Sequence, residues 1–180
     1  SNTIGGSGFF DGVGDYLAVA NDVSNQMGTG NWTAEAWIYI TSYTLLNPVF
    51  AKGGSTTDWF LATNNVNGRL MTGIGATDYL ADTGPIVSLN AWHHVALVRS
   101  GTTLTIYLDG VAGGTVTGVT QDFASTGPLH IGRGRDTSIN YLSGYVSNSR
   151  LVKGTAVYTG NFTPPTIPVT AIANTSLLLN

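Results

Sequence analysis

Hydrophobic and polar positions alternate most clearly over residues 91–110, AWHHVALVRSGTTLTIYLDG. From 104 to 108, apolar side chains take one face and polar or aromatic side chains take the other, and this period of two predicts a half-buried β-strand. The segment 92–99 is largely apolar on both faces, which predicts a strand deep in a sheet with cover on both sides. Ser100-Gly101 joins the two strands, and Asp109-Gly110 predicts the next tight turn.

Similar short segments, separated by turn residues, fill most of the chain. We expect strands or strand-like segments at 7–10, 15–20, 32–41, 48–52, 58–63, 69–74, 78–81, 111–119, 128–132, 141–152 and 175–179. The first two flank Asp11-Gly12-Val13-Gly14 and predict a hairpin, and the last is expected to return near the N-terminus. Gly144 predicts a bulge or a close backbone approach.

Two further features define the fold class. Residues 160–168, GNFTPPTIP, carry three prolines and predict an extended segment across the surface rather than a central strand. No segment shows a sustained helical apolar period, and turn signals recur about every 8–12 residues. The pattern therefore predicts an all-β protein with almost no helix.

Composition excludes several classes of protein. Charged residues are 9% of the chain, against about 25% on average, and the seven basic residues are scattered, so no basic patch for nucleic acid is expected. The absence of cysteine excludes disulfides and thiolate metal sites. No run approaches the ~18 apolar residues of a membrane span, and no signal peptide is visible. Since the sequence starts with Ser1, we expect a processed product or a piece of something longer.

The length favours one domain. At 180 residues, without an internal repeat or a low-complexity linker, the chain is predicted to form a single domain over 1–180.

A set of segments in a fixed order carries a family resemblance. They are FDGVGDYLAV (10–19), NWTAEAWIYI (31–40), NAWHHVALVRSGTTLTIYLDG (90–110), PLHIGR (128–133) and LSGYVSNSRLVKGTAVYTGNFTPP (142–165). Together they resemble the laminin-G-like branch of the concanavalin A-like lectin/glucanase superfamily. The closing segment resembles the version found in bacteriophage virion and tail proteins. The resemblance implies a jelly-roll sandwich of two curved antiparallel sheets, with ligands on the concave face or the rim loops, sometimes through Ca²⁺.

The resemblance also implies a function, which we state as an expectation. We expect a non-catalytic, lectin-like adhesion module that binds glycans, located on a phage virion or an extracellular surface protein. The alternative is a purely structural virion decoration or spacer domain that contacts other virion or surface proteins. A glycoside hydrolase is a minor alternative. A homo-oligomer is compatible with all three, and neither nucleic acid nor membrane is an expected partner.

Catalysis is not expected from the acidic residues. A retaining glycosidase needs two carboxyl groups about 5 Å apart, and this chain contains one glutamate, Glu35. The positions that follow on its strand face hold Trp37 and Tyr39 rather than acids. We interpret Glu35 as a structural carboxylate bonded to backbone or arginine.

Histidines and aspartates leave the metal question open. His93 and His94 are adjacent on a strand and point to opposite faces, so they do not share a metal. His130 lies on another strand, and all three are interpreted as packed or half-buried histidines. A Ser-His-Asp triad fits the composition, although no nucleophile-elbow motif is present. A rim Ca²⁺ site fits several aspartates in loops, but its ligands are unknown: Asp11, Asp15, Asp22, Asp58, Asp78, Asp82 and Asp136. For Asp11 and Asp15 the alternative is turn chemistry.

Glycan recognition requires flat aromatic rings and planar polar groups. The candidates expected on exposed loops are Trp59, Tyr79, Arg133, Arg135, Asp136 and Tyr141. Arg133 and Arg135 are two residues apart and, if extended, would share a side and grip a sugar carboxylate. The alternatives are that Trp59 packs in the core and that Arg135 and Asp136 belong to a solvated loop. Trp37 and Trp92 are expected to pack in the core or on the concave face.

Overall fold

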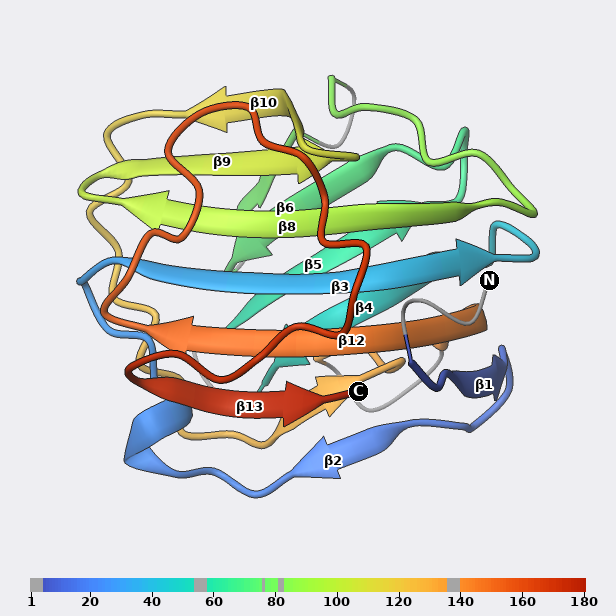
Figure 1. Cartoon of the computed structure of the whole chain (residues 1–180), viewed down its shortest axis with the longest axis horizontal. Coiled ribbons are helices and arrows are strands. Elements are labelled where there is room, and N and C mark those ends of the chain that lie inside the picture. The colour runs from blue at the N-terminus through green and yellow to red at the C-terminus, as the bar shows by residue number, and fades with distance from the viewer. Residues whose placement is uncertain (1–4, 54–57, 76, 81–82, 136–139) are drawn as a thin grey trace.

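The computed structural model describes residues 5–53, 58–75, 77–80, 83–135 and 140–180. It confirms the all-β prediction, because two antiparallel sheets face each other and helix is limited to one short 3-10 turn, η1 (Val23–Asn25), within this described part. Figure 1 shows the two layers with their strands crossing at an angle, as in a jelly-roll sandwich.

Sheet A forms the layer nearer the viewer in Figure 1. Its strands among the described residues are, in spatial order, β1 (Gly8–Asp11), β12 (Ser143–Lys153), β3 (Trp32–Ile40), β8 (Trp92–Ser100), β9 (Thr103–Leu108) and β10 (Val111–Val116), with β13 (Thr175–Leu179) also paired to β12. β1 and β13 share one edge of β12, so the last strand does return beside the N-terminal one, as the sequence predicts.

Sheet B forms the second layer. Its strands, again among the described residues, are β2 (Leu17–Val19), β11 (Leu129–Ile131), β4 (Leu46–Lys52), β5 (Trp59–Asn64), β6 (Leu70–Ile74) and β7 (Thr77–Tyr79). The strands predicted at 58–63 and 69–74 correspond to β5 and β6, which pair with each other.

The opening alternation is also confirmed. β8 lies inside sheet A between β3 and β9 and is buried along most of its length, as its two apolar faces predict. Ile106 of β9 points inward and is fully buried. Asp109 (φ 51°) and Gly110 (φ 78°) both adopt the left-handed conformation, which matches the primed turn that joins two strands of a twisted sheet.

The predicted N-terminal hairpin is wrong. β1 pairs with β12 in sheet A, whereas β2 pairs with β11 in sheet B. The turn at Gly12-Val13-Gly14 therefore carries the chain from one sheet to the other. Alternation marks both strands correctly, but it does not say which partner each strand finds.

Gly144 is a point of close approach, as predicted. A Cβ there would lie 1.9 Å from the carbonyl oxygen of Tyr39 on β3, and the residue has φ 145°. The bulge in β12 lies further along, between Ser147 and Arg150, where Asn148 adopts φ 50°.

A long segment without regular structure covers part of the outer face of sheet A. We call residues 154–172 the strap. Figure 1 shows it leaving β12, climbing across β3, β8 and β9 as far as β10, and returning to β13. It contains the proline-rich stretch, which confirms the prediction of an extended surface segment. Near its far end the Phe162 amide donates to the Gly110 carbonyl at 2.9 Å, which ties the strap to the turn after β9.

The main core lies between the sheets. Trp32 of β3 and Trp59 of β5 meet there, with ring centroids 5.0 Å apart, and Phe123 packs on Trp32 at 5.3 Å. A smaller cluster lies on the outer face of sheet A, where Ala96 and Val98 of β8 pack beneath the strap. In the described part of the chain, no helix has the length and apolar character that crossing a membrane requires.

Candidate functional site

Four aromatic rings form a row across the outer face of sheet A. Phe9, Tyr145, Tyr39 and Trp92 lie on the neighbouring strands β1, β12, β3 and β8, and each stands directly opposite the next in the strand register. Their successive centroid distances are 5.1, 5.9 and 5.7 Å. Because strands lie about 4.8 Å apart, the row extends for roughly 14 Å. We call these four residues the aromatic platform.

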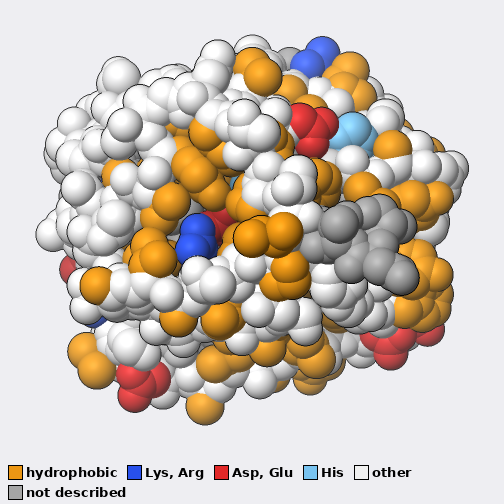
Figure 2. Space-filling model, viewed as in Figure 1, with side chains coloured by type: hydrophobic (Ala, Val, Ile, Leu, Met, Phe, Trp, Pro, Cys, Tyr) orange, Lys and Arg blue, Asp and Glu red, His pale blue; other side chains and the backbone are white. Residues whose placement is uncertain are grey.

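The platform is open and has a polar border. Phe9 is 57% exposed, and the other three rings are half-buried. Ser7, Thr41 and Asn90 border the part formed by Tyr39, Trp92 and Tyr145, and together these six residues line a hollow of about 480 Å³. A volume of this order suits a small-molecule or sugar ligand. Figure 2 views this face and shows hydrophobic side chains gathered near the centre of the face and again toward the right-hand margin of the face.

The strap-covered half of the same face contains a buried ionic cluster. Glu35 is fully buried, and its carboxylate accepts from Arg150 Nε at 2.7 Å and from the Tyr158 hydroxyl at 2.7 Å. His94 Nε2 lies 3.1 Å from the same carboxylate. His94 Nδ1 has no hydrogen-bond partner among the described residues, so the contact with Glu35 is the polar contact of this ring. The interpretation of Glu35 as a structural carboxylate bonded to arginine is confirmed.

The cluster shifts the pKa values of its members. Burial by itself would raise the pKa of Glu35, but hydrogen bonds from His94 and Tyr158 and the charge of Arg150 outweigh it and hold that pKa below its ordinary value. Burial, followed by the adjacent Glu35 carboxylate, raises the pKa of Tyr158. Glu35 therefore stays ionised and fully occupied in holding the strap, which is a poor arrangement for a general acid.

Trp37 belongs to this covered half as well. Its indole Nε1 donates to the Pro165 carbonyl of the strap at 3.1 Å, and its ring meets His94 edge-on at 5.5 Å. Trp37 thus fulfils the expectation of a packing residue, whereas Trp92 on the next strand joins the platform.

His93 points away from His94 and joins a separate network. Its Nδ1 lies 2.7 Å from Asp109 Oδ2, and its Nε2 lies 2.7 Å from the Ser88 hydroxyl. The other Asp109 oxygen accepts from the His94 amide at 2.8 Å. This is the order of a Ser-His-Asp triad, but acyl transfer also requires oxyanion donors and a substrate pocket around the serine. What the contacts do is fasten the start of β8 to the turn after β9.

His130 is buried on sheet B, as expected. Its ring meets Tyr16 edge-on at 5.4 Å. Burial, and secondarily the nearby Arg133 charge, lower its pKa.

Two of the predicted ligand-binding residues are not on exposed loops. Trp59 is fully buried in β5 and packs on Trp32, so its placement on the surface was wrong and the core alternative holds. Tyr79 lies on the edge strand β7, half-buried, and its ring packs against the main core. Both residues lie in segments, 58–63 and 78–81, that the alternation already predicts to be strands, so the error was to expect their side chains on exposed loops.

The remaining candidates gather on the outer face of sheet B but diverge. The Arg133 guanidinium lies 4.7 Å from the centroid of the Tyr16 ring, and Tyr141 pairs with Arg133 across the loop. The Arg135 guanidinium instead lies 5.0 Å from the Phe60 ring, over β5. The structure therefore does not support a joint grip on one carboxylate. Asp136 lies outside the described residues.

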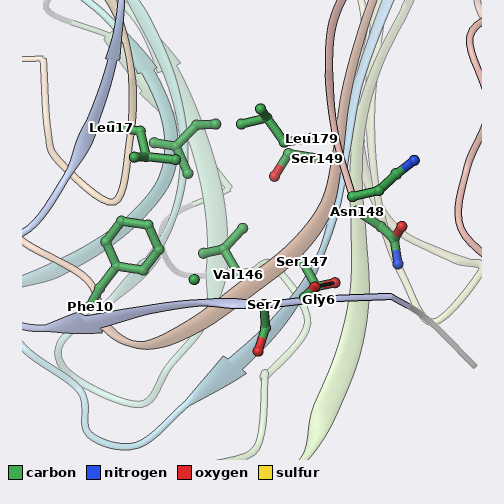
Figure 3. Close-up of a pocket in the computed structure, with 12 residues that line it drawn as sticks. Gly6, Ser7, Phe10, Leu17, Val146, Ser147, Asn148, Ser149 and Leu179 are labelled. Atoms are coloured by element: carbon green, nitrogen blue, oxygen red, sulfur yellow. Dashed lines mark hydrogen bonds between the residues drawn. The ribbon is translucent and has the colours of Figure 1, made fainter. Parts of the chain in front are cut away.

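A recess of about 340 Å³ lies where residues 6–8 and 179–180 meet β12, and we call this region the seam. Figure 3 shows Phe10, Leu17, Val146 and Leu179 around it. The Ser147 hydroxyl at its mouth already donates to the Gly6 carbonyl. Its lining also includes polar residues, among them Asn148, Ser149 and Asn180, but its one aromatic ring, Phe10, is only 3% exposed, so the aromatic platform offers more ring surface to a ligand.

Calcium stays a prediction. Asp11 accepts from the Val13 amide at 2.7 Å and Asp15 from the Asp11 amide at 3.2 Å, so turn chemistry is confirmed for both. Asp22 caps η1 by accepting from the Ser24 amide at 2.8 Å. In the described ranges no three histidine, aspartate or glutamate side chains gather in a way that could hold a metal. Asp82 and Asp136 fall outside those ranges.

Sequence reasoning missed the platform as a unit. The sequence places Tyr39 on the strand face of Glu35, but the register that sets Tyr39 opposite both Trp92 and Tyr145 is a long-range property. The available signal is an aromatic residue near a strand end in each segment, Tyr39 in 31–40 and Trp92 in 90–99.

The chain belongs to the concanavalin A-like lectin/glucanase superfamily. The model of that family, the laminin G type, matches residues 11–157. This confirms the resemblance at the level of the superfamily. No curated protein sequence is significantly similar to the chain.

Solved structures share the fold at low sequence identity. A heptameric SAP-like pentraxin from Limulus polyphemus is 19% identical, with a TM-score of 0.62 over 84% of this chain and 76% of its own. The CBM40 of the Ruminococcus gnavus IT-sialidase, bound to α2,3-sialyllactose, is 13% identical, with a TM-score of 0.61 over 88% and 95%. Domains LG4-5 of the mouse laminin α1 chain are 17% identical, with a TM-score of 0.61 over 81% and 40%.

Proposed function

We propose that this chain is a non-catalytic glycan-binding module and that the aromatic platform is its binding surface. The observation that carries the proposal is the row of four rings in strand register, open to solvent and bordered by hydroxyl and amide groups. Apolar faces of sugar rings pack on such aromatic surfaces, while the border supplies hydrogen bonds to their hydroxyls. The CBM40 relative with sialyllactose bound supports this class of ligand.

The test is binding to a glycan array, followed by calorimetry with a glycan that scores. Trp92→Ala and Tyr39→Ala should each lower the affinity about tenfold or more, because each removes one ring of the row. Tyr16→Ala is the matched control, since it removes a partly exposed ring on the other sheet. Equal losses in all three variants would contradict the platform as the binding surface.

A protein-binding spacer is the second candidate. The observation that favours it is the same row of one exposed and three half-buried rings, because aromatic residues are also enriched in protein interfaces. A folded chain that binds no glycan on the array, and whose Trp92→Ala variant loses a protein partner, would favour this role over the first.

We also propose that the chain acts as one domain over 1–180, on a phage virion or an extracellular surface. The similarity of the closing segment, 142–165, to phage virion and tail proteins supports this location. Copurification of the chain with intact phage particles would test it.

A further inference from the structure

A small pocket on the outer face of sheet B lies beside a loop neck that is fixed in place. The Gly134 amide donates to the Asn140 carbonyl at 2.9 Å, and the backbones of Arg133 and Tyr141 form an isolated antiparallel β-bridge. A Cβ at Gly53 would lie 2.3 Å from the Arg135 carbonyl oxygen, so the neck rests directly on the end of β4 and only glycine fits beneath it. These contacts position Arg135 and Asn140 so that both line the same pocket.

The pocket is small and has an apolar floor. Its volume is about 90 Å³, and its floor comes from β4 and β5: Leu46, Pro48, Phe60 and Ala62. Arg135, Asn140 and Asp78 supply its polar groups. At ~30 Å³ per water molecule this space suits one substituent of a sugar rather than a whole ring.

Two polar atoms of residues that line the pocket are buried and have no hydrogen-bond partner among the residues that the structure describes. They are a donor, Arg135 Nη1, and an acceptor, Asn140 Oδ1. Buried polar atoms are nearly always paired, so a donor and an acceptor left open beside one pocket indicate a ligand with the complementary pair.

The charge of the pocket favours a neutral ligand. Arg135 Nη2 lies 3.9 Å from Asp78 Oδ1, so the guanidinium already has an acidic neighbour. A sugar carboxylate bound at Arg135 would be repelled by Asp78, whereas a neutral carbonyl would not.

We propose that this pocket binds the acetamido group of an N-acetylated sugar. The carbonyl oxygen of that group accepts from Arg135 Nη1, its N–H donates to Asn140 Oδ1, and its methyl packs on Phe60 and Ala62. A secondary amide with a methyl group supplies all three features. The pocket is a second site, on the other sheet from the platform, and the choice of a sugar as carrier rests on the proposed function.

Nuclear magnetic resonance of the ¹⁵N-labelled full chain separates the two sites. The Gly134 amide and the Asn140 side chain report on the pocket, and the Trp92 indole reports on the platform. The probes are the β1,4-linked trimer of N-acetylglucosamine, the corresponding glucose trimer and sodium acetate. We expect the N-acetylglucosamine trimer to shift the pocket signals in a saturable way, and the other two probes to leave them unchanged.

Variants then assign the contacts. Asn140→Leu removes the acceptor at similar size, and Arg135→Met removes the donor while keeping an apolar stem. Each should weaken binding at the pocket about three- to tenfold, as expected for one lost hydrogen bond. Arg133→Met is the matched control and should bind as the parent does, because Arg133 lies on Tyr16 and does not line the pocket. Thermal unfolding checks that each variant is folded.

The outcomes distinguish this inference from the proposed function. Shifts at Trp92 alone overturn the pocket and leave the platform standing. Shifts at Gly134 and Asn140 alone support the pocket and count against the platform. Equal pocket shifts with the glucose trimer overturn selection of the acetamido group, and saturable shifts with acetate identify an anion site instead. Silence at all three reporters overturns the pocket, and the glycan array decides on the platform.

Discussion

The outer face of sheet A has two halves built from the same strands, and they differ in what covers them. On β3 the alternating positions Glu35 and Trp37 lie under the strap, while Tyr39, next on the same face, lies in the open platform. Under the strap, polar groups are bonded to one another and to strap carbonyls. In the open half, the rings mainly contact each other across strands.

The comparison shows that alternation identifies which residues share a strand face, but not whether another segment covers that face. A buried carboxylate in the covered half must be compensated, so it is tied to Arg150, His94 and Tyr158. Rings in the open half need no such partners and are available to a ligand. One strand face therefore serves stability at one end and, under the function proposed above, recognition at the other.

In the covered half, the substitution expected to destabilise the protein most is Glu35→Gln. This change leaves the buried Arg150 charge without its partner, so we expect a loss of about 3–5 kcal/mol in the free energy of unfolding. Urea unfolding followed by tryptophan fluorescence measures it. Thr115→Ala, an exposed residue on β10, is the control and should change stability by less than about 0.5 kcal/mol. A Glu35→Gln variant as stable as the parent would show that the cluster does not hold the strap.

Acid should weaken the same half progressively. The pKa of Glu35 in the folded state lies below its ordinary value of 4.5, so its contribution is complete above pH 4.5 and is lost as the pH falls through the folded-state value. The parent should therefore lose stability on acidification more steeply than Glu35→Gln. Urea unfolding of both proteins between pH 7 and pH 3 tests this, and parallel curves would refute it.

In the open half, Phe9→Ala should barely change the free energy of unfolding of the protein. Phe9 is 57% exposed on the edge strand β1, so we expect a change within about 0.5 kcal/mol in the same urea assay. A loss comparable to that of Glu35→Gln would mean that the platform is a structural cluster and would weaken its assignment to glycan binding.

Much of the fold could be read from local pattern. The alternation of 104–108, the Asp109-Gly110 turn and the prolines of 160–168 are short-range signals, and the structure bears out each of them. The N-terminal hairpin failed because pairing between sheets is set by the whole core rather than by the turn between two strands.

The candidate site was predicted less well for a similar reason. Arg133 and Arg135 were expected to act together, but each guanidinium reaches a different ring: Tyr16, just before β2, or Phe60 on β5. Trp92 was recognised on its strand face, but its neighbours Tyr39 and Tyr145 come from two other strands. Residue types and spacing do not encode such cross-strand register.

The seam at β12 has a consequence for how this unit combines with other polypeptides. A Cβ at Gly5 would lie 3.7 Å from the backbone carbonyl carbon of Asn180, so the first and last described residues are neighbours in space. Residues 5–180 could therefore be inserted into a surface loop of a host protein without separating the two ends of that loop. Copies could also be joined in tandem or circularly permuted through short linkers. This arrangement of the two ends suits a domain that is inserted into many different host proteins.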